Sequence, residues 1–210
     1  IIQMFLVLDT ETTGLPLRKG FNNYYSPNLV NKYKNSRVIE LAYIIFDEDY
    51  QIQKSNTTLV KPDGFTIRNS EFHGITHDVA TKEGIQIQDA LDEFYKDIVK
   101  FNVHTIVGHN INFDKHILLS EMCRQQDIVS SIKYSFIDKL NTKCTMFMGS
   151  QYYNLRKSPK LIDLYTKLIS ENKQISTQLP SYIQDHDPTT QHRALSDVMT
   201  CLICFVLMQV

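Results

Sequence analysis

Apolar residues form short continuous runs in the first third of the chain. The runs at residues 4–8 and 38–46 are rich in Leu, Val and Ile and predict two buried strands. Residues 51–60 predict a third strand, and residues 105–107 predict a fourth one further along. These segments have the length and composition of strands that pack inside a domain.

The rest of the chain carries apolar residues three and four positions apart, which is typical of amphipathic helices. Such stripes cover residues 90–99, 112–126, 161–169 and 194–206. Within the second helix we expect Glu121 and Arg124 to face outward. Strands come first and then alternate with helices. This order predicts an α/β fold, with a central mixed β-sheet flanked by α-helices.

A polar stretch at residues 18–37 interrupts this pattern. It contains five Asn and three Tyr together with Lys19, Lys32 and Lys34. This composition favours a solvated loop over a packed element. The mixture of aromatic and basic side chains also suits the wall of a groove for a single nucleic acid strand, and a plain surface loop stays an equal alternative.

Length and charge set limits on the kind of protein. A chain of 210 residues fits one domain, so we expect residues 1–210 to form a single domain with one core. The 22 basic and 23 acidic residues give a formal charge of −1, which excludes a strongly basic surface as a general attraction for nucleic acids. Any attraction for phosphate must therefore be local.

The cysteines and the terminal segments indicate where the protein resides. The four cysteines lack the spacing of a disulfide framework, which favours a reducing compartment. Cys201 and Cys204 form a C-x-x-C at helical spacing in an apolar helix, so we expect buried thiols rather than half of a zinc site. No segment resembles a signal peptide or a membrane span. We expect an intracellular protein, in the cytoplasm or the nucleus, that is neither secreted nor bound to a membrane.

Candidate chemistry begins at the end of the first predicted strand. Asp9 and Glu11 stand two positions apart there, so both carboxylates can face one point. Two carboxylates in one place need a cation. An isolated Asp-x-Glu is more often a solvated strand end. Here a turn around Gly14, with Thr12 and Thr13, follows directly, and this turn makes a functional site more plausible than the pair alone would.

The run DTETTGLP at residues 9–16 resembles the first signature of the DEDD 3′→5′ exonucleases. Three further segments of the chain fit the same family in the same order. Residues 107–114, VGHNINFD, end on a third acid, Asp114, and residues 192–197, HRALSD, match the histidine-containing branch, with His192 and Asp197. Residues 72–76, FHGIT, resemble a segment often found between the first signature and the segment that ends on Asp114. Taken singly, Asp114 and Asp197 would be ordinary partners of a helix dipole, and His192 a surface histidine.

The resemblance implies a ribonuclease H-like fold and hydrolysis assisted by two divalent cations. It implies that Asp9 bridges the two ions, that Glu11 and Asp197 complete one of them, and that Asp114 holds the other. Carboxylate ligands without thiolates favour Mg²⁺ or Mn²⁺. His192 would be the general base, since an imidazole accepts a proton at physiological pH.

The resemblance also implies which residues contact the substrate. The nucleotide at the 3′ end would lie against the turn after the first strand, and the scissile phosphate near the end of the strand at 105–107. His73 is either structural or lines the substrate, and Phe113 either stacks on a base or belongs to the core. The implied substrate-binding residues are Thr12, Thr13, Leu15, His73, Asn110 and Phe113.

Three hypotheses for the function remain open at this point. The first is an exonuclease that releases nucleoside monophosphates from the 3′ end of single-stranded or frayed DNA in proofreading or repair, with a polymerase as a candidate partner. The second is an exoribonuclease that trims RNA with the same site, since one sequence does not reveal contacts to the 2′-hydroxyl. The third is a nucleic-acid-binding or scaffolding module that lost its chemistry, against which all four acids and the histidine argue.

Overall fold

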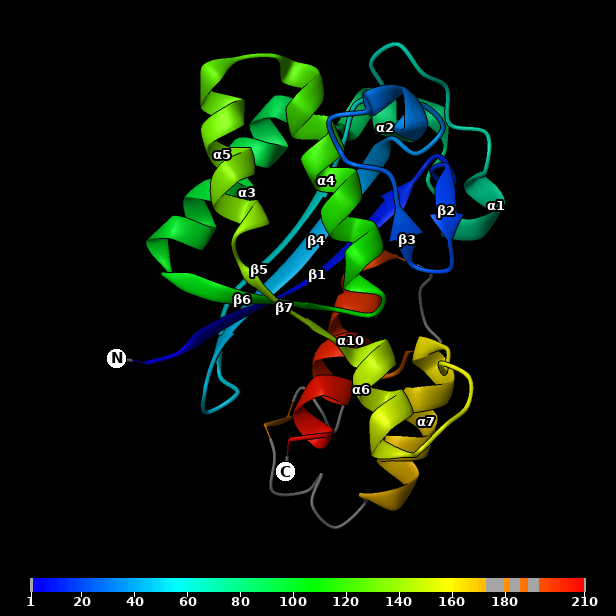
Figure 1. Cartoon of the computed structure of the whole chain (residues 1–210), viewed down its shortest axis with the longest axis vertical. Coiled ribbons are helices and arrows are strands. Elements are labelled where there is room, and N and C mark those ends of the chain that lie inside the picture. The colour runs from blue at the N-terminus through cyan, green and yellow to red at the C-terminus, as the bar shows by residue number, and fades with distance from the viewer. Residues whose placement is uncertain (1, 173–179, 182–185, 189–192, 210) are drawn as a thin grey trace.

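A mixed five-stranded sheet runs through the centre of the molecule (Figure 1). The computed structural model describes residues 2–172, 180, 181, 186–188 and 193–209. The sheet has the order β5-β4-β1-β6-β7, with β1 antiparallel to β4 and parallel to β6. Its strands are β1 (Met4–Thr12), β4 (Val38–Asp47), β5 (Ile52–Leu59), β6 (Val103–Gly108) and β7 (Asn141–Cys144). The predicted mixed sheet is therefore confirmed.

Helices cover both faces of this sheet (Figure 1). Side chains alternate along β1, so Leu6 and Leu8 pack into one apolar cluster while Phe5 and Val7 pack into the other. The first cluster includes residues of α3 (Ile87–Lys100) and α4 (Ile111–Gln125), and the second includes residues of α7 (Leu161–Glu171) and α10 (Ala194–Leu207). These four helices are the ones that the apolar stripes predict.

Several elements carry no clear pattern in the sequence. They are the short helices α1 (Ser70–His73) and α2 (His77–Glu83), the helices α5 (Ile128–Asp138) and α6 (Thr145–Tyr152), and the edge strand β7. In α5, Ile128 is 80% exposed and Ile132 is 57% exposed. The buried positions of α5 include the polar residues Ser130 and Lys133, while large apolar residues face the solvent, so the sequence shows no clear apolar stripe.

The polar stretch at residues 18–37 is more ordered than its composition suggests. It contains the strands β2 (Arg18–Gly20) and β3 (Asn23–Tyr24), which pair as a hairpin, and the 3-10 helix η1 (Val30–Tyr33). Tyr33 and Ser36 are fully buried. The hydroxyl of Tyr33 donates to the backbone carbonyl of Tyr25, which satisfies the buried phenol. The expectation of a solvated loop is wrong for the part that ends in these buried residues.

Glu121 on α4 is buried, although the helical pattern predicts that it faces the solvent. Its side chain is 1% exposed, and it accepts a hydrogen bond of 2.6 Å from Nε of Arg37. Arg124 lies 3.6 Å from its other oxygen. The prediction is wrong because two arginines, one of them from the loop before β4, cover and compensate this carboxylate.

The two cysteines of the C-x-x-C are buried, as the sequence predicts. Cys201 and Cys204 are buried free thiols on α10, within the apolar cluster that covers the sheet. Among the described residues, no helix combines the length and the apolar character that a membrane crossing requires.

Candidate active site

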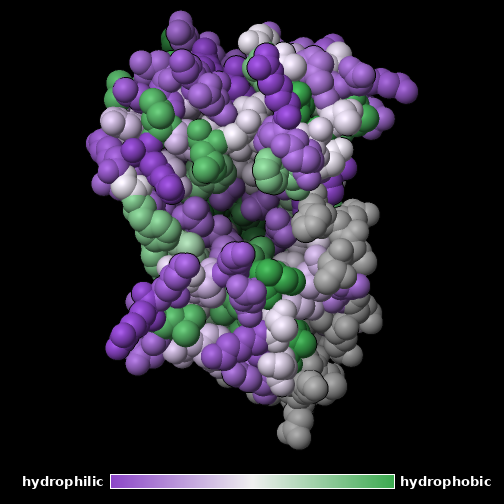
Figure 2. Space-filling model, turned by 90° about the vertical axis from the view of Figure 1, so that its right-hand side faces the viewer, coloured by the Kyte–Doolittle hydropathy of each residue, from purple (hydrophilic) through white to green (hydrophobic). Residues whose placement is uncertain are grey.

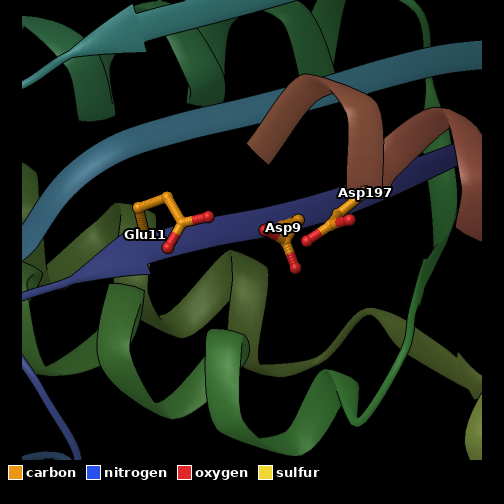
Figure 3. Close-up of side chains that lie close together, drawn as sticks. All are labelled: Asp9, Glu11 and Asp197. Atoms are coloured by element: carbon orange, nitrogen blue, oxygen red, sulfur yellow. The ribbon is translucent and has the colours of Figure 1, made fainter. Parts of the chain in front are cut away.

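Three carboxylates converge where β1 passes the beginning of α10 (Figure 3). Asp9 and Glu11 project from the same side of β1 because they are two positions apart. Asp197 projects from the first turn of α10, which begins at Ala194. One oxygen atom from each of these three side chains lies within 4.8 Å of the other two. The structure therefore brings together three of the four acids that the sequence predicts.

Asp114, the fourth acid, lies beside this cluster and contacts β1 directly. It is 3% exposed, and its Oδ1 accepts hydrogen bonds from the backbone N–H of Thr10 at 3.0 Å and from the Thr10 hydroxyl at 2.7 Å. β6 pairs with β1 only as far as Val7 and Val107, so the N–H of Thr10 lies beyond the last pair. The first turn of α4 fills that place, and Asp114 supplies the acceptor that another strand residue would have supplied.

Burial and mutual repulsion raise the pKa values of these acids. Burial is the largest cause for Asp9, whose pKa lies well above its ordinary value, and repulsion from Asp114 and Asp197 adds to it. Burial and repulsion from Asp197 and Glu40 raise the pKa of Glu11 to about 7. Burial also raises the pKa of Asp114 to about 7, against the lowering effect of the Thr10 hydrogen bonds. A bound divalent cation would relieve this concentration of negative charge.

A partly buried ion pair that the sequence analysis missed holds the start of α10 in place. Glu40 on β4 stands opposite Glu11 and is 1% exposed. Its two oxygens accept hydrogen bonds of 3.0 and 3.1 Å from Nε of Arg193, and one of them accepts another of 3.0 Å from the N–H of Ala194. Since Asp197 is one turn further on, this pair fixes where Asp197 meets β1. A signal existed, because Glu40 is an acid inside the apolar run at residues 38–46.

The turn after β1 uses its threonines to support its own backbone. The hydroxyl of Thr12 donates to the carbonyl of Gly14 at 2.9 Å, and the hydroxyl of Thr13 donates to the carbonyl of Asn35 at 3.1 Å. Gly14 has a φ of +149°, so the prediction that this glycine allows an unusual backbone angle is confirmed. Leu15 is 72% exposed and can contact a substrate, whereas both threonine hydroxyls already have partners.

Two of the other predicted substrate residues present buried polar atoms that lack a partner. Nδ1 of His73 accepts a hydrogen bond of 3.1 Å from the N–H of Ile75, while its Nε2 has no partner among the described residues. Oδ1 of Asn110, at the start of α4, is likewise buried and without a partner in the described part of the chain. Phe113 packs against the apolar cluster on this face of the sheet and meets the ring of Tyr24 edge on.

His192, the predicted general base, lies outside the described residues. Its role therefore stays a prediction. The neighbouring Arg193 has an extended backbone, with φ −139° and ψ 146°, and α10 begins directly after it. Asp197 lies in the first turn of this helix.

Comparisons with known proteins agree with this geometry. The family model RNase_T, described as Exonuclease, matches residues 6–205, so the chain belongs to this exonuclease family. The resemblance to DEDD exonucleases read from residues 9–16 is thereby confirmed, while membership of the histidine-containing branch stays a prediction. No curated protein sequence matches the chain.

Among solved structures, the chain is similar to Escherichia coli exonuclease I at low sequence identity. The complex with a dA16 oligonucleotide gives a TM-score of 0.63 at 17% identity and covers 99% of this chain and 41% of that one. The complex with dT13 gives 0.60 at 18% identity, with coverage of 95% and 39%. The zinc-bound complex with single-stranded DNA gives 0.64 at 17%, with coverage of 98% and 40%. The likeness shows a ribonuclease H-like fold, and the chain spans about two fifths of those proteins.

Proposed function

We propose that residues 1–210 act as one metal-dependent exonuclease domain that removes nucleoside monophosphates from the 3′ end of single-stranded DNA. The proposal is carried by the meeting of Asp9, Glu11 and Asp197 within 4.8 Å, in a chain of the exonuclease family. Three carboxylates from two distant parts of the sequence have no need to meet at one point for packing alone, because their repulsion costs stability.

The donor set fits divalent cations such as Mg²⁺ or Mn²⁺. Asp9, Glu11 and Asp197 would hold one ion, and Asp9 and Asp114 would hold a second, in every case through hard oxygen atoms. When bound, the ions would lower the pKa of the attacking water and offset negative charge on the scissile phosphate and the leaving oxygen. The burial that raises the pKa values of these acids also strengthens their attraction for cations.

The chain's own groups would move the proton and orient the substrate. His192 accepts the proton of the attacking water in this proposal. His73 acts as a neutral donor: because its Nδ1 already accepts the N–H of Ile75, its Nε2 carries the proton, and burial keeps its pKa below the ordinary value. Its N–H and Oδ1 of Asn110 would then bind polar atoms of the terminal nucleotide, since each is buried without another described partner.

The exposed Leu15 and the ring of Phe113 flank the proposed nucleotide site. Leu15 would pack against the terminal base from the turn after β1, because most of its side chain is accessible. Thr12 and Thr13 would contribute through the shape of that turn rather than through their hydroxyls, which are engaged within the loop. Single-stranded DNA is the favoured substrate because the E. coli exonuclease I structures of similar fold hold dA16 and dT13.

The test uses matched DNA and RNA single strands labelled at the 5′ end and incubated with Mg²⁺. A ladder that shortens from the 3′ end of the DNA, with release of monophosphates, is the expected result. A strand that ends in a 3′-phosphate and the variant Asp9→Asn serve as controls for direction and for the carboxylate site. Faster degradation of RNA would support the RNA-trimming hypothesis, and intact strands that bind tightly would support a binding module. A polymerase partner stays a prediction.

A further inference from the structure

A cavity lies on the other side of the first turn of α4 from Asp114, the fourth acid of the candidate site. It has a volume of about 660 Å³ and lies where β7 ends and α4 and α6 begin. Asn112 of α4 lines this cavity, whereas Asp114, two residues later, reaches Thr10 beside the acids. Two helical residues are about 200° apart, so one turn serves both places on its opposite sides. Polar and aromatic residues of the lining are Asn22, Asn112, Lys115, His116, Asp138, Thr142, Lys143, Phe147 and Gln151.

The cavity opens toward the end of the molecule at which β1, β6 and β7 terminate. Figure 2 looks at the molecule from that side and shows a hollow across its middle, between an upper and a lower part. The β2–β3 hairpin contributes Asn22 to the cavity from one side, and α6 contributes Phe147 and Gln151 from another. Carboxyl ends of parallel strands are the usual place for ligands in open α/β sheets.

We propose that this cavity binds the nucleotide that precedes the terminal one in a single-stranded substrate. The inference rests on the proposed function, which places the 3′-terminal nucleotide at the neighbouring acids. It adds a second binding position and predicts that the enzyme prefers strands over isolated nucleotides.

Phe147 and Asn22 provide what an unpaired base needs. Phe147 is 40% exposed although it lines a cavity, so one face of its ring is available for stacking. Asn22 has a left-handed backbone with φ of 50°, and its carbonyl accepts a hydrogen bond of 2.9 Å from Nδ2 of Asn112. Oδ1 of Asn22 is buried and has no partner among the described residues. This fixed acceptor suits an amino group on the edge of a base.

Lys143 provides the charge that a phosphate needs. Lys115 donates to the carbonyl of Asp138 at 2.8 Å and lies 4.0 Å from its carboxylate, so these two opposite charges in the cavity offset each other. Nδ1 of His116 contacts the carbonyl of Asn112 at 2.7 Å, and burial lowers the pKa of this histidine, which favours its neutral form. Lys143 is exposed and forms no ion pair with any residue that the structure describes. It therefore leaves a net positive charge in the cavity.

A cavity at the opposite end of β6 offers a matched control. It has a volume of about 550 Å³, is lined by Val103 at the start of that strand, and also contains one phenylalanine and one lysine, Phe136 and Lys139. Phe136 is 40% exposed, as is Phe147. The two cavities thus share aromatic and basic residues but differ in their distance along the strand from the acidic cluster. Only the cavity near the acids should affect the binding of a substrate.

The experiment compares Phe147→Ala and Lys143→Gln with Phe136→Ala and Lys139→Gln. Binding of a fluorescein-labelled oligo(dT) strand is measured by anisotropy with Ca²⁺, and kcat/KM is measured with Mg²⁺ on unlabelled oligo(dT) and on thymidine 5′-(p-nitrophenyl phosphate). We expect Phe147→Ala to bind the strand about ten-fold more weakly, through KM rather than kcat, because stacking on one base is lost. The nitrophenyl ester lacks the base, sugar and phosphate of a preceding nucleotide, so Phe147→Ala should reduce its hydrolysis much less than it reduces degradation of the strand.

The outcomes separate the second nucleotide position from the proposed exonuclease function. Equal strand binding by the wild type and by Phe147→Ala overturns the second position, and so does an equal loss on the strand and on the nitrophenyl ester. If the wild type hydrolyses neither substrate, the proposed exonuclease function fails. In that case a weaker anisotropy signal for Phe147→Ala and Lys143→Gln, but not for the two control variants, would still support the cavity as a nucleotide site.

Discussion

Asp114 accepts two hydrogen bonds from Thr10, one from its backbone N–H at 3.0 Å and one from its hydroxyl at 2.7 Å. The two residues are 104 positions apart in sequence, and their contact joins the first turn of α4 to the strand that carries Asp9 and Glu11. The side chain of Thr10 points to the opposite face of β1 from Asp9 and Glu11. The same short segment of β1 therefore carries two acids on one face and binds Asp114 through Thr10.

Replacing Thr10 by valine tests this contact. Thr10→Val keeps the shape of the side chain and removes the hydroxyl, so the buried carboxylate loses one of its two donors. We expect the free energy of unfolding to fall by about 1 to 2 kcal/mol and the exonuclease rate to fall about ten-fold. Urea unfolding and strand degradation measure the two effects. Thr10→Ser should restore both, and a valine variant with full activity would show that the hydroxyl does not position Asp114.

Removing the charge of Asp9 should separate activity from stability. The metal-free protein holds this carboxyl group against burial and against repulsion from Asp114 and Asp197. We therefore expect Asp9→Asn to lose exonuclease activity at least about 1000-fold while its melting temperature in EDTA stays the same or rises. Mg²⁺ should raise the melting temperature of the wild type but not of the variant. Substantial activity of Asp9→Asn with Mg²⁺ would contradict the proposed site.

The pair of Glu40 and Arg193 can be tested by a double-mutant cycle. If the pair positions α10, then Glu40→Gln and Arg193→Gln should each lower activity, and the double variant should lose less than the sum. Each single change should lower the free energy of unfolding by about 2 kcal/mol. This loss is smaller than for a fully buried pair, because the side chain of Arg193 is 38% exposed. A purely electrostatic role predicts opposite changes in Mg²⁺ affinity for the two single variants, which calorimetry would detect.

His109 should make stability depend on pH. Burial lowers its pKa to about 4, and its two ring nitrogens contact the Thr145 hydroxyl at 3.0 Å and the Pro159 carbonyl at 3.2 Å. The unfolded chain takes up this proton near pH 6.5, so the stabilisation is complete above that pH and is lost as the pH falls toward 4.

Urea unfolding at about pH 7.5 and about pH 5 measures the effect. We expect the wild type to lose about 2 kcal/mol more between these values than His109→Gln, which can keep a donor but does not titrate. The acids with raised pKa values change stability in the opposite direction, and comparing the two proteins at each pH cancels their contribution. Parallel pH profiles of the two proteins would show that His109 is not the group responsible.

Much of the fold follows from the hydrophobic pattern, for a physical reason. β4 is buried on both faces, so nearly all of it is apolar. α3 buries one broad stripe, and α10 is buried on all sides from Thr200 to Leu207. The pattern fails where burial is achieved in another way. Glu121 is covered by Arg37 from another segment and by Arg124 of its own helix, and Tyr33 packs into the apolar cluster that includes residues of α3 and α4. Such contacts depend on residues that are far apart in sequence.

The candidate site was easier to predict than the contacts that support it. Asp9, Glu11 and Asp197 could be predicted because the segments around them resemble the signatures of the exonuclease family, and the structure brings the three acids together. Glu40 and Thr10 act through other residues, so their roles become visible only when the strands and helices are assembled. A buried acid in an apolar strand is nevertheless a sign that a cationic partner must exist.

The distribution of the acids along the polypeptide has a consequence for synthesis. Asp9 and Glu11 leave the ribosome before Asp197, on α10, which emerges only after nearly 190 further residues have been added. A growing chain can pair β1 with β4 long before α10, which carries Asp197, has been synthesised. If these carboxylates hydrolyse nucleic acid as proposed, a chain that has not yet been extended through α10 lacks Asp197, one of the three acids of the cluster, and should be inactive.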